Sequence, residues 1–179
     1  MKFLFFVVIQ LPLVASAQVG SSYKDYLQSD FSDFFHTAEI RRTPYKGGEL
    51  REIKTGGFQD YITIYIYTDT VSNGIHEATL ETDREWMEAD ATADLSRDLV
   101  KSFLLDFICT SDQSKAMAAG DLLFNHKSTK DKFALELQDV FNDKKDSISE
   151  SFSRCTVTAQ NLKKDEKTSF RLRITENTR

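Results

Sequence analysis

Residues that commonly hold metals or form redox centres are scarce in this sequence, which has three histidines and two cysteines among 179 residues. His36, His76 and His126 are far apart, and the His-Glu-x-x-His pattern of zinc hydrolases is absent. No Cys-x-x-Cys pair occurs, which argues against a thiol redox site. We therefore expect no metal site and no cofactor.

Short motifs of the common enzyme classes are also missing. The sequence has no Gly-x-Ser-x-Gly, and its glycine pairs at 47–48 and 56–57 lack the patterns of nucleotide-binding loops, so they indicate turns. Asp90, Asp94 and Asp98 are spaced for one helix face, which indicates a solvated face, with a weak cation site as the alternative. No catalytic residue is predicted, although a triad can assemble from distant segments.

The charge pattern excludes two classes of partner. The chain carries a net charge of −5, and its basic residues are dispersed among acidic ones, as at Lys144-Lys145 and Lys163-Lys164. Nucleic acids and anionic membrane surfaces are bound by clustered Lys and Arg, and no such cluster is present. We therefore expect neither of these partners.

Residues 1–17 have the features of a secretory signal peptide. Lys2 precedes an apolar run over 3–14, and Ala15-Ser16-Ala17 is a small-x-small cleavage site. The run is too short to cross a hydrocarbon core of about 30 Å as a helix, so we expect no membrane span after cleavage. No cysteine follows the signal for lipid attachment. The sequence predicts an exported protein, periplasmic or extracellular, with residues 18–179 forming one domain.

Cys109 and Cys155 form an even pair in a chain that is predicted to be exported. In an oxidising compartment, such a pair with no leftover thiol most simply indicates one disulfide. Two buried free thiols are the alternative.

Hydrophobic periodicity predicts an α+β fold. Apolar residues recur at helical spacing, and β-branched and aromatic residues alternate elsewhere as in strands. We expect an antiparallel sheet that packs on one side against helices. The predicted elements are helices at about 22–36, 91–108 and 131–142, a long central hairpin at about 60–82 and a closing hairpin at about 151–175.

Other segments are predicted with less regular patterns. Residues 38–45 and 49–55 are short candidate strands, and 111–127 favours a helix that Gly120 ends or bends. Residues 83–89, which include the only tryptophan, are read as a polar connection.

The central hairpin runs from Tyr61-Ile62-Thr63-Ile64-Tyr65-Ile66-Tyr67 through an Asn73-Gly74 turn to residues 75–82. A two-residue turn would mix isoleucine with glutamate on one face. A three-residue loop at 72–74 with Gly74 in the left-handed conformation separates the faces. It predicts an isoleucine face for the core, a tyrosine face opposite, and the pairs Ile66–Leu80, Thr68–Ala78 and Ile64–Thr82.

The tyrosine face is the one candidate surface for function. Tyr61, Tyr65 and Tyr67 could line a groove for an unknown protein or a small apolar ligand, since tyrosine offers contact area with a polar tip. Alternatively they pack within the fold. The sequence predicts a small exported binding or interaction domain, and an exported enzyme, such as a hydrolase with a site built from separated segments, is the alternative.

Overall fold

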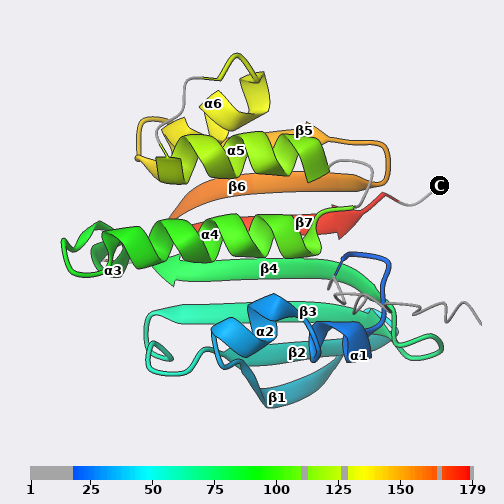
Figure 1. Cartoon of the computed structure of the whole chain (residues 1–179). Coiled ribbons are helices and arrows are strands. Elements are labelled where there is room, and N and C mark those ends of the chain that lie inside the picture. Colours follow the sequence, from blue (N-terminus) through cyan, green and yellow to red (C-terminus); the bar gives the residue numbers. More distant parts are fainter. Residues whose placement is uncertain (1–17, 110–112, 126–128, 165–166, 178–179) are drawn as a thin grey trace, which may run out of the picture.

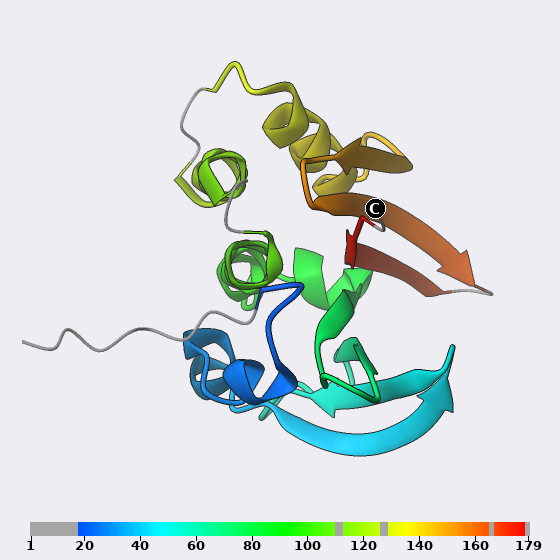
Figure 2. The same cartoon turned by 90° about the vertical axis from the view of Figure 1, so that its right-hand side faces the viewer.

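The computed structural model describes residues 18–109, 113–125, 129–164 and 167–177, and within them a seven-stranded antiparallel sheet is covered by helices on one side (Figures 1 and 2). This architecture confirms the predicted α+β class. The predicted signal peptide at residues 1–17 lies outside the described residues.

The sheet joins two groups of strands that are distant in the chain. The N-terminal group is β1 to β4, the C-terminal group is β5 to β7, and the order across the sheet is β1-β2-β3-β4-β7-β6-β5. Pairing of β4 with β7 therefore closes the fold. The strands are β1 (Ala38–Tyr45), β2 (Gly48–Lys54), β3 (Ile62–Asp69), β4 (Ile75–Asp83), β5 (Ser147–Ser151), β6 (Cys155–Lys164) and β7 (Lys167–Glu176).

Two of the described helices precede the N-terminal group, the other four connect it to the C-terminal group, and the helices lie in front of the sheet in Figure 1. They are α1 (Tyr23–Tyr26), α2 (Asp30–Phe34), α3 (Arg84–Glu88), α4 (Ala93–Phe107), α5 (Gln113–Asn125) and α6 (Lys132–Phe141). The predicted helices at 91–108 and 131–142 are confirmed as α4 and α6. Asp131 caps α6 by accepting a hydrogen bond from the backbone N–H of Ala134 at 2.9 Å.

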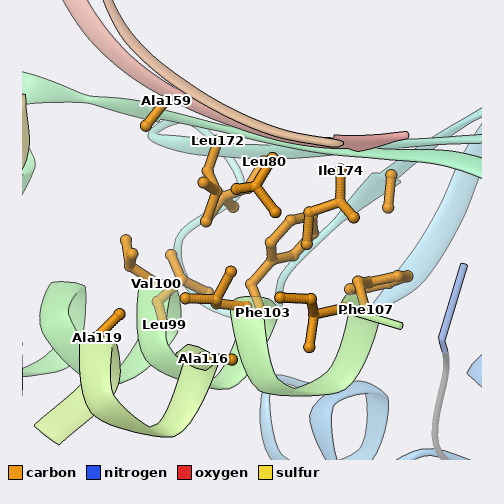
Figure 3. Packing of buried hydrophobic residues seen from close by; sticks show 14 of the residues in the cluster. Leu80, Leu99, Val100, Phe103, Phe107, Ala116, Ala119, Ala159, Leu172 and Ile174 are labelled. Carbon is orange, nitrogen blue, oxygen red and sulfur yellow. The ribbon is translucent and has the colours of Figure 1, made fainter. Parts of the chain in front are cut away.

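The hydrophobic core lies between α4 and the middle of the sheet. Phe103 and Phe107 of α4 point toward Leu80, Leu172 and Ile174 of β4 and β7 (Figure 3), and all five side chains are fully buried. These strand residues alternate with polar ones, because successive side chains of a strand point to opposite faces. One face of the sheet therefore packs in the core, and the other faces solvent.

The sequence predicts that Gly120 ends or bends its helix, and α5 runs through Gly120, so this glycine does not end the helix. A Cβ atom at Gly120 would lie 2.8 Å from Cγ of Lys101 on α4, closer than carbon atoms approach without displacement. The glycine is therefore explained by the close approach of two helices rather than by a helix end.

The central hairpin has the predicted faces but not the predicted register. Ile64 pairs with Leu80 and Ile66 with Ala78, a shift of two residues from the prediction, and a bulge follows Tyr67. An even shift preserves the faces, because side chains alternate with a period of two. The loop is longer than three residues, and Asn73 (φ 56°) rather than Gly74 takes the left-handed conformation.

The predicted helix at 22–36 is two short helices. Ser29 interrupts it and caps α2 by accepting a hydrogen bond from the backbone N–H of Ser32 at 3.2 Å. The aromatic stripe still faces the core, except for Phe34, which is 66% exposed. A serine that serves as a cap competes with the helical hydrogen bonds, and the hydrophobic spacing alone does not reveal this.

Two further elements were not predicted. Residues 83–89 include α3, in which Trp86 is buried and its ring lies 5.4 Å from that of Phe58. Strand β5 precedes the closing hairpin, whose strands pair as far as Lys164 and Lys167 and so leave a short connection between them. Exposed strand residues are polar and resemble a loop in the sequence.

The predicted disulfide between Cys109 and Cys155 is present, with a Cα–Cα distance of 6.1 Å. It joins the residue that follows the C-cap of α4 to the first residue of β6, and both cysteines are buried. The crosslink therefore ties the main helix to the C-terminal group of strands. A disulfide is compatible with an exported protein.

Replacing both cysteines by serine should lower the free energy of unfolding by about 4 kcal/mol. The crosslink restricts the unfolded chain, and its removal restores the conformational entropy of that chain and so favours unfolding. Urea unfolding followed by circular dichroism measures this loss. Thiol titration of the denatured, unreduced wild type is the control and should detect no free thiol. Two titratable thiols would contradict the crosslink.

The N-terminal segment is held by a buried arginine. The Arg51 guanidinium lies 4.1 Å from the centre of the Tyr23 ring and donates to Glu39 at 3.0 Å and to Glu49 at 2.6 Å. Such a contact combines a cation–π interaction with paired charges, which offsets the cost of burying the guanidinium. Burial raises the pKa of Tyr23, with a contribution from Glu39, and burial likewise raises the pKa of Tyr26.

These two tyrosines predict a loss of stability at alkaline pH. In the unfolded chain a tyrosine ionises near about pH 10, whereas the buried hydroxyls ionise at higher pH. The contribution of these protonated hydroxyls to the free energy of unfolding is therefore complete below about pH 10, and it is lost as the pH rises through the folded-state pKa. Urea midpoints measured between about pH 8 and about pH 11 should fall less steeply in Tyr26→Phe than in wild type. Equal slopes would contradict this assignment.

Candidate functional site

The face of the sheet opposite the helices carries a groove, here called the central groove. Figure 2 shows the described helices on one side of the sheet and none of them over the other side. The groove has a volume of about 410 Å³, within the size range of small-ligand sites. Its lining residues come from β1, β2, β3, β4 and β7 and from the turn between β1 and β2. They are Tyr45, Lys46, Leu50, Tyr65, Glu77, Thr79, Glu81, Arg171 and Arg173.

Sheet register sets the cross-section of the central groove. Tyr65 of β3, Thr79 of β4 and Arg173 of β7 are directly opposite one another on neighbouring strands. Thr79 is only 6% exposed although none of the described helices covers it, because larger side chains stand on either side. The groove therefore has a threonine floor between a tyrosine wall and an arginine wall.

Two ion pairs fix the arginine wall. Nε of Arg171 donates to Glu81 at 2.5 Å, and Nη2 of Arg173 donates to Glu77 at 2.6 Å. Nε of Arg173 is buried and has no acceptor among the described residues. Each guanidinium has five N–H donors, so both retain donors beyond those that hold the glutamates. The arginines are thus positioned and still able to bind an anionic group.

Tyr65 contributes a hydroxyl that stays protonated at neutral pH. Burial raises its pKa, and the negative charges of Glu81 and Glu52 raise it further. The groove therefore offers an aromatic ring, a hydroxyl donor and two guanidinium groups within one concave surface.

The other predicted tyrosines lie differently. The Tyr67 ring packs edge-on against Tyr45 at 5.5 Å, and its hydroxyl donates to the carbonyl of Lys46 at 3.0 Å. A Cβ atom at Gly48 would lie 2.7 Å from Cε2 of Tyr67, so glycine leaves room for the ring. Tyr67 therefore supports the wall that Tyr45 forms.

Tyr61 lines a second groove of about 680 Å³ at the other end of the same face. Its lining also includes Thr63, Lys164 and Lys167, and Glu81 lines both grooves. The three predicted tyrosines thus share one face but occupy three different settings. How they act in recognition stays a prediction.

Sequence reasoning missed the charged half of the central groove. Arg171 and Arg173 alternate with apolar residues in the closing hairpin, which places them on the face away from the core. This alternation is a usable signal for exposure. Their position beside Tyr65, however, requires the pairing of β4 with β7, which are separated by almost the whole helical region.

One histidine converges with carboxylates outside the central groove. Nδ1 of His76 lies 2.6 Å from Glu176, and Nε2 lies 3.2 Å from Asp69. Because both ring nitrogens face carboxylates, neither is directed at a nucleophile. Hydrogen bonds from the Ser72 hydroxyl and backbone N–H lower the pKa of Asp69, so this carboxyl stays ionised. His126 lies outside the described residues.

In the part of the chain that the structure describes, no group of three or more histidine, cysteine or acidic side chains could hold a metal ion. None of its described helices is long and apolar enough to span a membrane. No protein-family model, curated protein or solved structure matches the chain.

The different settings of Tyr65 and Tyr67 predict different effects of substitution. Tyr67→Ser should lower the free energy of unfolding by about 2–4 kcal/mol, because it removes a packed ring and leaves space above Gly48. Tyr65→Ser should cost about half as much or less, because one side of its ring borders the groove. Urea unfolding of both variants measures the difference. A larger loss in Tyr65→Ser would assign Tyr65 to packing.

Proposed function

We propose that this chain is an exported binding domain that takes its ligand in the central groove. The observation that carries the proposal is the pairing of Tyr65 with Arg171 and Arg173 across a buried threonine, on the sheet face that no described helix covers. Aromatic rings and arginines are the side chains most often enriched in recognition sites. The predicted signal peptide and the disulfide support export.

The lining of the groove argues for a polar ligand. Five of its nine residues are charged, and Leu50 is its one aliphatic side chain. An apolar ligand would remove water from these charges without replacing the lost hydrogen bonds. We therefore favour a ligand with hydrogen-bonding groups over the small apolar ligand that is one expectation from the sequence.

An enzyme has less support. A hydrolase site would need a histidine and a carboxylate beside a reacting group in a pocket. Among the described residues, His76 meets carboxylates but does not line the central groove, and both its ring nitrogens are engaged. Binding is the function that the groove supports best.

Fragment screening by NMR tests the location of the site. A library of small polar and aromatic fragments, added to the ¹⁵N-labelled domain without its first 17 residues, should shift amide signals of β3, β4 and β7 around Tyr65, Thr79 and Arg173. The same screen on Tyr65→Ser should lose most of these shifts. Fragments concentrate where ligands bind, because such sites combine concavity with oriented polar groups.

A serine substitution at Tyr61 is the matched control, because it removes a tyrosine that immediately precedes the same strand and lies outside the central groove. Its fragment shifts around Thr79 should match those of wild type. Fragments that cluster on the helical side, or shifts that survive in Tyr65→Ser, would overturn the proposed site.

A further inference from the structure

We propose that the ligand of the central groove is an acidic oligosaccharide, a short chain of sugars that carry carboxylates. This inference rests on the proposed function and names the ligand class of the same site. It follows from what the groove offers to a ligand: the kind of donors on its floor, the aromatic wall and the balance of charge.

The floor of the groove can contact a ligand through side chains, because its backbone N–H and C=O groups are already paired within the sheet. It lies in the interior of the sheet, where β3, β4 and β7 pair with neighbours on both sides. Their backbone N–H and C=O groups are used within the sheet. Peptides that bind to sheets add a strand at an edge, where backbone groups are free. This interior groove therefore suits a ligand that side chains alone recognise, as they recognise a sugar.

The aromatic wall suits a sugar ring. Tyr45 and Tyr65 both line the groove, and Tyr65 carries a protonated hydroxyl that can donate to a ligand oxygen. The face of an aromatic ring carries partial negative charge and attracts the C–H groups of a pyranose, while the ring area excludes water. A sugar thereby obtains an apolar contact and hydrogen bonds on one surface.

The opposite wall supplies anion recognition. Arg171 and Arg173 are on the same face of β7, two residues apart, and each is oriented by its own glutamate. Guanidinium groups bind carboxylates in planar, charge-assisted pairs. A sugar carboxylate that faces this wall would find donors already held in place.

Charge along the face extends the anion preference beyond one sugar. The two grooves meet at Glu81, and together they contain five cations, Lys46, Lys164, Lys167, Arg171 and Arg173, on a chain whose net charge is −5. Of the four carboxylates, Glu77, Glu81 and Asp83 already accept hydrogen bonds from protein groups. The ion pairs described within these grooves join Arg171 to Glu81 and Arg173 to Glu77, and neither includes a lysine. A linear ligand with repeated carboxylates matches this arrangement.

Titration calorimetry with a galacturonic acid trisaccharide tests the proposal. We compare it with its fully methyl-esterified form, which has the same sugars and length but no charge, and with a glutamate tripeptide, which keeps the carboxylates but not the sugar rings. The trisaccharide should bind at least about tenfold more tightly than either, since charge-assisted hydrogen bonds and ring contacts are both required.

Arg173→Gln should weaken trisaccharide binding about tenfold or more, and Arg171→Gln serves as a second variant if the first fails to fold by circular dichroism. Arg97→Gln is the matched control, since Arg97 pairs with Asp94 on α4 and should leave binding unchanged. Equal binding of the esterified sugar, tighter binding of the tripeptide, or no effect of either groove variant would overturn the proposal. If fragments bind the groove but the trisaccharide does not, the ligand class is wrong while the binding site stands.

Discussion

Burial of one face of β3, β4 and β7 against α4 is the interaction on which the rest of the structure depends. Ile64, Leu80 and Leu172 are fully buried in the same cluster as Phe103 of α4. Because strand side chains alternate, each buried residue forces its neighbour to the opposite face. That face receives Tyr65, Thr79 and the arginines of β7, so the groove follows from the same alternation that makes the core.

The sequence carries enough information to predict elements and faces, but less to predict how segments pair. The periodicity of residues 91–108 is strong, and α4 forms where expected. The hairpin register differs because the loop folds around Asp69, whose carboxylate accepts from the backbone N–H groups of Val71 and Ser72 at 2.8 and 2.7 Å. Strand β5 is short and serine-rich, so its sequence gives little hydrophobic signal.

The candidate site shows the same division. The two-residue alternation of strand side chains alone places Tyr61, Tyr65 and Tyr67 on one face, as predicted. This alternation does not predict that Gly48 leaves room for the ring of Tyr67. Nor does it predict that Arg173, more than ninety residues later in the chain, lies beside Thr79. These contacts depend on tertiary pairing, and a single sequence does not reveal tertiary pairing.

The ion pairs of the open face contribute little to the free energy of unfolding. Exposed pairs contribute about 0–1 kcal/mol, and Arg173 and Arg171 retain 42% and 36% of their side-chain exposure. The core on the other face supplies the larger free energy, since each fully buried aliphatic or aromatic side chain contributes about 1.5–3 kcal/mol. The arginines can therefore be exchanged at little cost to the fold. Such a division lets recognition on the open face vary while the buried face keeps the sheet intact.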